Sequence, residues 1–216
     1  MKPFPLILSS PSGGGKTTIA RRLLADRPQD LGYSVSCTTR EPRAGEVNGR
    51  DYHFISVDEF VERRERGEFA EWALVHGNLY GTLIKEVTRV LDSGRHVIMD
   101  IDPQGARKFH AAFPESVLVF VLPPSAQVLF ERLAARSTDS AKSIATRLRN
   151  ARDELAAVHE YHYVVVNEDL DTAVRQVGSI IEAESARRDR IRALDEQVAE
   201  LLGQLERRLD HHTSVS

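Results

Sequence analysis

Residues 6–18 read LILSSPSGGGKTT and pass from an apolar run through a glycine-rich turn into a helical pattern. The spacing matches the phosphate-binding loop G-x-x-x-x-G-K-[ST], except that Ser10 stands at the first glycine. Backbone N–H groups of such a loop point at phosphate oxygens, at the positive end of the following helix. A glycine-rich turn with an incidental lysine is the alternative, and it leaves the flanking strand and helix unexplained. We therefore predict a phosphate loop that comprises Ser12, Gly13, Gly14, Gly15, Lys16, Thr17 and Thr18.

A phosphate loop of this kind needs a second carboxylate at the end of a neighbouring strand, where it holds a metal ion directly or through water. The apolar run 97–99 is followed by Asp100 and Asp102. Because alternate residues of a strand point the same way, we expect the two aspartates to face one side. An ordinary turn at the strand end is the alternative. We predict Asp100 and the Thr17 hydroxyl as ligands of Mg²⁺, with Lys16 placed at the β- and γ-phosphates.

The composition narrows the class of protein. The 216 residues include 29 basic and 32 acidic side chains, for a net charge of −3, and this balance argues against binding to a nucleic acid polymer. Of the basic residues 24 are Arg and five are Lys, so the arginines are either surface or aimed at anions. A lone Cys37 excludes an intrachain disulfide framework and fits a reducing compartment. The apolar runs are too short for a signal peptide or a membrane span, so we expect a cytoplasmic protein without a membrane partner.

Short apolar runs alternate with helical patterns, which predicts an α/β fold with a mainly parallel sheet. The expected core strands are residues 6–8, 97–99, 117–122 and 163–166, and the expected helices are residues 16–25, 103–113 and 140–158. Between residues 33 and 80 apolar and polar residues alternate, which predicts antiparallel strands over 33–37, 51–55 and 69–75. A capping box at Ser56–Glu59 predicts a short helix that ends near Gly67. This segment is an expected α+β insertion, and the Arg-rich stretch 132–152 an expected lid.

Several further stretches resemble the guanylate kinase family in its order and spacing. They are SVSCTTREPR at 34–43, GEVNGRDYHF at 45–54, EFAEW at 68–72, GNLYGT at 77–82, DIDPQGA at 100–106 and VNEDL at 166–170. Together with the phosphate loop they extend over about residues 4–185. The departures from the family pattern are Ser10, Leu79, Pro103 and Ser137, and none of them removes a side chain with an expected chemical role.

The resemblance implies transfer of the ATP γ-phosphoryl group to GMP, and to dGMP, with Mg²⁺ as cofactor. It implies a single domain over 1–216 with a three-layer P-loop core at 1–35, 86–130 and 153–190. A GMP-binding subdomain is expected at 36–85, a helical lid at 131–152 and a C-terminal helical extension at 190–216.

The resemblance also implies roles for individual side chains. Arg40, Arg43, Tyr52 and Tyr80 would hold the GMP phosphate, since guanidinium forks clamp a dianion. Glu71 and Asp102 would accept the N1–H and N2–H₂ donors of guanine, with Ser36 and Thr82 on the remaining base edge. Arg136 and Arg147 would close from the lid, and Asn167 would lie beside adenine. Each of these residues alone fits a surface or packing role, and the matched spacing favours the site.

Two other functions remain as alternatives. One is a non-catalytic scaffold domain of guanylate kinase type, which would keep the monophosphate site and lose the ATP loop. The other is a kinase for AMP or a pyrimidine monophosphate. A zinc site at His159 and His162 is disfavoured, because no third ligand is spaced with them.

From residue 170 to residue 209 the pattern is helical almost without a breaker. Its apolar residues follow a heptad seam of alternating steps of three and four, namely Ile191, Leu194, Val198, Leu201 and Leu205. We expect this seam to pair two subunits into a homodimer. A helix that folds back on its own core is the alternative.

Overall fold

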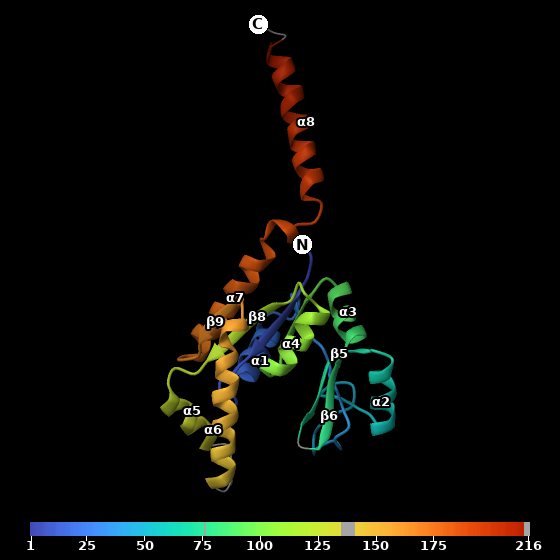
Figure 1. Ribbon diagram of the computed structural model, residues 1–216. Helices are drawn as coiled ribbons and strands as arrows, with labels where there is room; N and C mark the ends of the chain where they lie inside the picture. Colours follow the sequence, from blue (N-terminus) through green and yellow to red (C-terminus); the bar gives the residue numbers. More distant parts are fainter. Residues whose placement is uncertain (76, 135–140, 214–216) are drawn as a thin grey trace. The chain divides into compact units, whose positions relative to one another are not determined.

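The first apolar run forms β1 (Pro5–Ser9), and all five of its residues are buried. It is the central strand of a five-stranded sheet in a computed structural model that describes residues 1–75, 77–134 and 141–213 (Figure 1). The strand order is β2-β7-β1-β8-β9, and every neighbouring pair is parallel. The other four strands are β2 (Leu31–Tyr33), β7 (His96–Asp100), β8 (Val117–Leu122) and β9 (Tyr163–Val166). The predicted α/β class is confirmed, and β2 is a strand that the sequence pattern did not predict.

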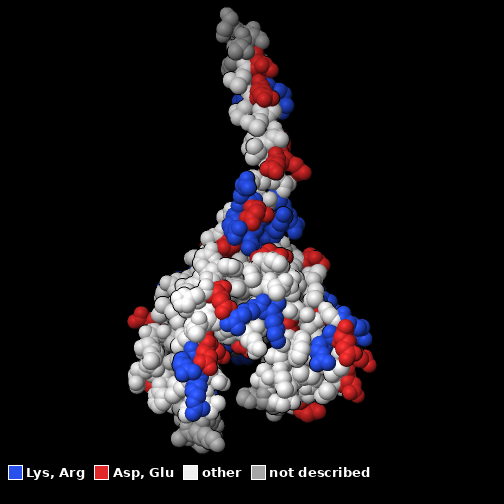
Figure 2. Space-filling model, viewed as in Figure 1, with Lys and Arg blue, Asp and Glu red and all other residues white. Residues whose placement is uncertain are grey.

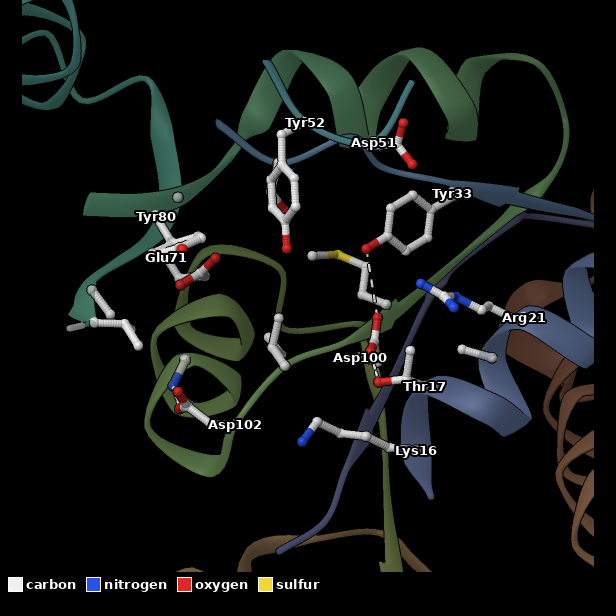
Figure 3. A pocket seen from close by; sticks show the side chains of 18 of the residues that line it. Lys16, Thr17, Arg21, Tyr33, Asp51, Tyr52, Glu71, Tyr80, Asp100 and Asp102 are labelled. Carbon is white, nitrogen blue, oxygen red and sulfur yellow. Dashed lines mark hydrogen bonds between the residues drawn. The ribbon is translucent and has the colours of Figure 1, made fainter. Parts of the chain in front are cut away.

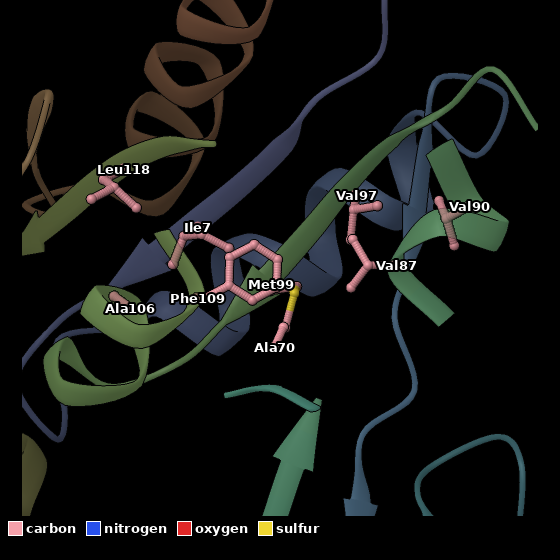
Figure 4. Close-up of a cluster of buried hydrophobic side chains, with 9 residues drawn as sticks. All are labelled: Ile7, Ala70, Val87, Val90, Val97, Met99, Ala106, Phe109 and Leu118. Carbon is pink, nitrogen blue, oxygen red and sulfur yellow. The ribbon is translucent and has the colours of Figure 1, made fainter. Parts of the chain in front are cut away.

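Helices cover both faces of this sheet. On one face α3 (Ile84–Asp92) and α4 (Pro103–Ala112) place Val87 and Phe109 against Ile7 of β1 and Met99 of β7 (Figure 4). Neighbouring side chains of a strand point to opposite faces, so Leu6 and Leu8 face the other side. There α1 (Lys16–Asp26) contacts β1, β2 and β7. The result is a three-layer arrangement. The loop 10–15 leaves the carboxyl end of β1 and leads into the start of α1.

A second sheet, in the order β4-β3-β6-β5, is formed by the predicted insertion. Its strands are β3 (Cys37–Thr38), β4 (His53–Phe54), β5 (Phe69–Val75) and β6 (Asn78–Leu83). The prediction of antiparallel pairing is correct for β5 with β6 and for β3 with β6, but wrong for β3 with β4, which run parallel. Tyr33 was also misplaced, because it belongs to β2 of the parallel sheet. The segment is therefore α+β with a mixed sheet.

One helix completes this insertion. It is α2 (Val57–Glu65), and it begins where the capping box predicts, since the Ser56 hydroxyl accepts a hydrogen bond from the Glu59 N–H at 3.1 Å. Its buried Phe60 packs against Cys37 and Leu83 of the sheet. The helix and the sheet thus share a small core of their own.

Two helices follow β8. They are α5 (Ala126–Ala134) and α6 (Ala141–Leu155), and a 3₁₀ turn over Ala156–Glu160 continues the second. Buried Leu129 and Leu133 of α5 pack against Ala151 of α6. Arg136 and Ser137, which belong to the predicted lid, lie outside the described residues.

The C-terminal part of the chain departs from the predicted continuous helix. The chain divides into a unit of residues 3–179 and a second unit of residues 1–2 with 180–216. The second unit begins within the helix α7 (Leu170–Ser185), a 3₁₀ turn covers Arg188–Arg190, and α8 (Leu194–Thr213) is a separate helix. Among the described residues, Ala193 is the only non-glycine residue with a positive φ, which is 54°. Helix propensity therefore yields here to a local turn, and Ile191 lies outside α8.

Contacts within the second unit explain the turn. Arg190 is 8% exposed and its guanidinium lies 3.2 Å from the Glu184 carboxylate. The Arg190 carbonyl accepts a hydrogen bond from the Lys2 N–H at 2.8 Å. A straight helix would carry Arg190 away from both partners. None of the described helices combines the length and the apolar character that crossing a membrane requires.

Candidate active site

The phosphate loop lies where the parallel register brings two strand ends together. β1 pairs with β7 so that Leu8 is opposite Asp100, and the loop leaves β1 just beyond this point. Gly15 has a φ of 101°, and a Cβ on it would lie 2.2 Å from Asn167 Nδ2, so only glycine fits there. Ser10, which replaces the first glycine of the pattern, is buried without a positive φ, and its hydroxyl donates to the Pro11 carbonyl at 2.9 Å. The loop therefore keeps its turn without that glycine.

Thr17 and Asp100, which the sequence predicts as Mg²⁺ ligands, are in direct contact. The Thr17 hydroxyl donates to Asp100 Oδ2 at 2.5 Å, and the Tyr33 hydroxyl lies 3.5 Å from Asp100 Oδ1 (Figure 3). Burial and the neighbouring Asp100 charge raise the pKa of Tyr33, so its hydroxyl stays protonated and available as a donor. A hydroxyl beside a carboxylate fits Mg²⁺, which takes one or two protein oxygens and completes its shell with water and phosphate.

Asp100 and Asp102 both line the cavity described below, but only Asp100 belongs to the strand. β7 ends at Asp100, so strand alternation does not extend to Asp102. Asp102 is instead the N-cap of α4, where its carboxylate accepts a hydrogen bond from the Gly105 N–H at 2.8 Å. The two carboxylates have separate partners, which lowers the repulsion between them.

A cavity of about 760 Å³ opens from the phosphate loop toward the second sheet. Figure 3 shows Lys16 and Thr17 on one side of it and Glu71 and Tyr80 on another, with the Tyr52 hydroxyl pointing inward. Ten of the predicted site residues line it: Lys16, Thr17, Ser36, Arg40, Arg43, Tyr52, Glu71, Tyr80, Asp100 and Asp102. The structure thus brings together both the phosphate-loop and the monophosphate groups of the prediction.

A chain of hydrogen-bonding side chains lies across the second sheet. Glu71 of β5 is paired in register with Thr82 of β6, and the Thr82 hydroxyl donates to Glu71 Oε1 at 2.7 Å. The Ser36 and Thr82 hydroxyls are 3.3 Å apart. Burial raises the pKa of Glu71, an effect that the Thr82 hydrogen bond opposes and the Asp102 charge reinforces. A buried carboxylate with one oxygen committed to Thr82 is suited to accept donors from a ligand.

Arg40 is held in place by several neighbouring side chains. Its Nη2 lies 2.9 Å from both carboxylate oxygens of Glu46, and its Nε donates to the Tyr80 hydroxyl at 3.2 Å. The guanidinium also lies over the Tyr52 ring, 5.6 Å from its centroid. The Glu46 carboxylate in turn accepts from the Arg43 N–H at 2.8 Å. This arrangement fixes a cation at the cavity wall before any anion arrives.

The other predicted residues lie outside the cavity lining. Thr82 is fully buried behind Glu71. Asn167 lies against the phosphate loop, where its Nδ2 donates to the Gly14 carbonyl at 2.9 Å. Arg147 of α6 donates to the Leu133 carbonyl at 3.3 Å. The loop residues outside the lining are Ser12, Gly13, Gly14, Gly15 and Thr18, and Arg136 is not among the described residues.

Known proteins are similar to this chain over most of its length. The guanylate kinase family model matches residues 2–184. The chain belongs to the guanylate kinase family. It is 48% identical over 200 residues to a guanylate kinase of Maricaulis maris, covering 92% of this chain and 91% of that relative. It is 51% identical over 168 residues to one from Nitratidesulfovibrio vulgaris, covering 78% and 81%. A crystal structure of guanylate kinase from Anaplasma phagocytophilum matches with a TM-score of 0.71 at 35% identity, covering 90% and 92%.

In this guanylate kinase family member, the sequence-based prediction missed five polar or charged residues that line the cavity. They are Arg21, Tyr33, Glu46, Arg50 and Asp51. A signal existed for Arg21, because it follows Thr17 by four residues and so shares its helix face. Glu46, Arg50 and Asp51 lie within the family stretch 45–54, and in the folded chain Glu46 pairs with Arg40 and Arg50 with Asp51.

Replacing Glu71 by Gln is expected to stabilise the nucleotide-free protein increasingly as the pH rises. The raised pKa means that the folded state loses stability as Glu71 ionises, from its ordinary value of about 4.3 upward. A glutamine carries no charge and its Oε1 still accepts from Thr82. Thermal unfolding of both proteins between about pH 4 and 8 tests this. Glu62→Gln, whose wild-type side chain is 67% exposed, is the control. A gain in melting temperature that shrinks with rising pH contradicts the prediction.

Proposed function

We propose that this chain is a nucleoside monophosphate kinase that transfers the γ-phosphoryl group of ATP to GMP, giving ADP and GDP. The observation that carries the proposal is one cavity with a phosphate loop on one side and the Glu71–Thr82–Ser36 chain on another. The guanylate kinases of Maricaulis maris and Nitratidesulfovibrio vulgaris, which match most of the chain, support the same substrates. dGMP is included, because none of the proposed base or phosphate contacts involves the sugar hydroxyls.

On the ATP side, Lys16 and N–H groups of the loop 12–18 would neutralise the β- and γ-phosphates, apart from the Ser12 N–H, which donates to Glu154. Thr17 and Asp100 would hold Mg²⁺, which supplies positive charge to the phosphate oxygens when bound. Asn167 would contribute to the adenine side, from its place beside the loop. Little covalent work falls to the protein, since phosphoryl transfer depends on positioning and charge stabilisation.

On the GMP side, the Glu71 carboxylate would accept donors from the Watson–Crick edge of guanine, with Asp102 as the second acceptor. Ser36 and Thr82 would complete the base contacts. Adenine presents an unprotonated N1 at this edge, which would face the carboxylate with a lone pair. A site built to satisfy such donors rejects analogues that lack them by a factor of roughly 10⁴ or more.

The GMP phosphate would be held by Arg40 and Arg43, with hydroxyl donors from Tyr52 and Tyr80. Arg40 keeps Glu46 as a partner, so its guanidinium is oriented before the substrate binds. The acceptor oxygen of GMP is already ionised at neutral pH, so no general base is needed. Arg136 and Arg147 would approach the transferring group from the lid and exclude water as it closes.

The proposed division of labour follows the segments of the chain. Residues 1–35, 86–130 and 153–190 would form the core, residues 36–85 the GMP-binding part, residues 131–152 the lid, and residues 190–216 the extension. The separate sheet formed by β3 to β6 supports the bounds of the GMP-binding part, residues 36–85. A reducing, cytoplasmic location is supported by the free, buried Cys37.

Lys16→Met is expected to lower turnover by at least about 10³-fold while GMP binding stays within about twofold, because the lost charge acts on the ATP phosphates. Coupled-assay turnover and calorimetric GMP titration measure the two effects. The wild-type protein is assayed beside it with ATP and GMP, dGMP, AMP, CMP or UMP. Turnover of AMP or a pyrimidine nucleotide above that of GMP would overturn the proposed substrate. Binding of GMP without turnover by the wild type would indicate a scaffold.

Glu71→Gln is expected to lower kcat/KM for GMP by about 100-fold, since a hydrogen bond to a charged group contributes up to about 3 kcal/mol. The KM for ATP should stay within about twofold, because Glu71 lies away from the phosphate loop. Steady-state kinetics with each substrate varied in turn provide the measurement. Equal losses for GMP and ATP would remove Glu71 from guanine recognition.

We also propose that α8 pairs two copies of the chain. Five apolar side chains along this helix are 45–64% exposed: Val198, Leu201, Leu202, Leu205 and Leu209. Much of the surface that α8 presents in Figure 2 is uncharged, with acidic and basic groups between. Exposed apolar residues at helical spacing are characteristic of a surface that a partner covers.

An antiparallel pair of α8 helices satisfies both the apolar and the charged residues. With the twofold axis between Leu201 and Leu202, Val198 lies opposite Leu205 of the partner helix. The same register sets Glu196 opposite Arg207 and Asp195 opposite Arg208. Such self-complementarity is what an isologous interface requires.

A chain ending at Ala193, which lacks α8 and keeps the Arg190 contacts, is expected to sediment as a single chain, while the full 24.2 kDa chain sediments as a dimer. Glu196→Arg should weaken the dimer about tenfold by placing like charges together. Adding Arg207→Glu to that variant should restore it. Sedimentation equilibrium measures all four proteins. Identical masses for the full and shortened chains would end the pairing proposal, and failure of the double variant to recover would reject the register.

A further inference from the structure

Glu154 joins the last turn of α6 to the phosphate loop, although no phosphate contact is expected of it. Its Oε2 accepts a hydrogen bond from the Ser12 N–H at 3.1 Å, across 142 residues of sequence. The Ser12 N–H belongs to the same loop as Lys16. This hydrogen bond links the position of α6 to that of the phosphate loop.

Opposing electrostatic effects act on the Glu154 carboxyl group beside the phosphate loop, and their net result is a raised pKa. Burial raises the pKa of Glu154, and the Asp102 charge adds to this. The Ser12 N–H and the Lys16 ammonium lower the pKa in opposition. The carboxylate is thus held by two groups of the phosphate loop itself, which offsets part of its desolvation cost.

The face of α6 that carries Glu154 also carries Arg147. Residues 147, 151 and 154 follow steps of four and three, so they share one side of the helix. Ala151, between them, is 1% exposed and packs on Leu129 and Leu133 of α5. Arg147 itself donates to the Leu133 carbonyl at 3.3 Å.

The same helix α5 also touches the phosphate loop. A Cβ built on Gly13 would lie 3.4 Å from Leu129 Cδ1 and 3.5 Å from Leu133 Cδ2, so the loop backbone packs directly on these leucines. The loop, α5 and α6 therefore form a closed circuit of contacts, and the Glu154–Ser12 hydrogen bond is the polar contact that closes it.

We propose that Glu154 is a positioning residue that sets the register of α6 against the phosphate loop, so that Arg147 is delivered to the transferring phosphoryl group. The inference rests on the proposed function, because it assigns Arg147 to that transfer. Glu154 itself touches no reacting atom. A lost register misplaces Arg147, and a displacement of about 1 Å at a reacting centre costs up to about 10²-fold in rate.

Three variants of the full chain test the proposal. Glu154→Ala is expected to lower kcat about tenfold, with both KM values within about twofold, because the lost contact matters in the transition state. Glu154→Gln should keep at least half of the wild-type kcat, since its Oε1 can still accept from Ser12. Asp153→Ala is the control: this neighbouring side chain is 67% exposed and should leave kcat unchanged. A wild-type kcat in Glu154→Ala, a loss confined to KM, or a Gln variant as slow as the Ala variant would each overturn the proposal.

A double-mutant cycle with Arg147→Ala shows whether the effect passes through Arg147. If it does, adding Glu154→Ala to Arg147→Ala lowers kcat by less than twofold. Multiplication of the two losses would overturn the proposed route. Should Glu154→Ala fail to fold, Glu154→Asp, which keeps the charge and shortens the reach, replaces it in the cycle with the same expectations. Failure of the wild type to phosphorylate GMP would reject the proposed function instead, so the two outcomes are distinct.

Discussion

The site depends on one constraint, the parallel register that sets Leu8 of β1 opposite Asp100 of β7. Chain segments that leave parallel neighbours at their carboxyl ends must meet, and here they are the phosphate loop and an acidic turn. The short contact between Thr17 and Asp100 follows directly. Apolar residues on both faces of β1 pack against the flanking helices, and this packing holds the strand in place within the sheet.

Around that point the cavity is arranged so that its charged groups already have partners. Arg40 is paired with Glu46, Glu71 with Thr82, and Asp102 with the start of α4. Each group is therefore oriented before a ligand binds, which reduces the ordering that binding must impose. The cost is visible at Glu71, whose burial works against its charge. The buried Glu71 charge lowers the stability of the ligand-free protein, and a ligand that donates hydrogen bonds to it would restore that stability.

The phosphate loop and the core strands were predictable from sequence because hydrophobic runs, glycines and a lysine act locally. The pairing of the strands was harder to predict from the sequence. The strand that ends at Tyr33 has three residues, too few to show a recognisable pattern of apolar and polar residues. β3 and β4 pair in parallel because the loop between them brings the chain back to the starting end of β3. No glycine or proline marks the break before α8 in the sequence. The break occurs because contacts with other residues hold Arg190 off the path of a continuous helix. Of the site, the family spacing supplied the cavity walls, whereas Tyr33 and Glu46 required the folded chain.

Glu71 and Thr82 are neighbours on β5 and β6, in a sheet separate from the one that carries the phosphate loop. On the proposed assignment, the part of the chain that distinguishes one base from another is encoded apart from the part that handles phosphate. Drift or engineering within residues 69–83 can then alter substrate choice while the catalytic apparatus is inherited unchanged. Such separation gives a small enzyme two independently evolvable halves.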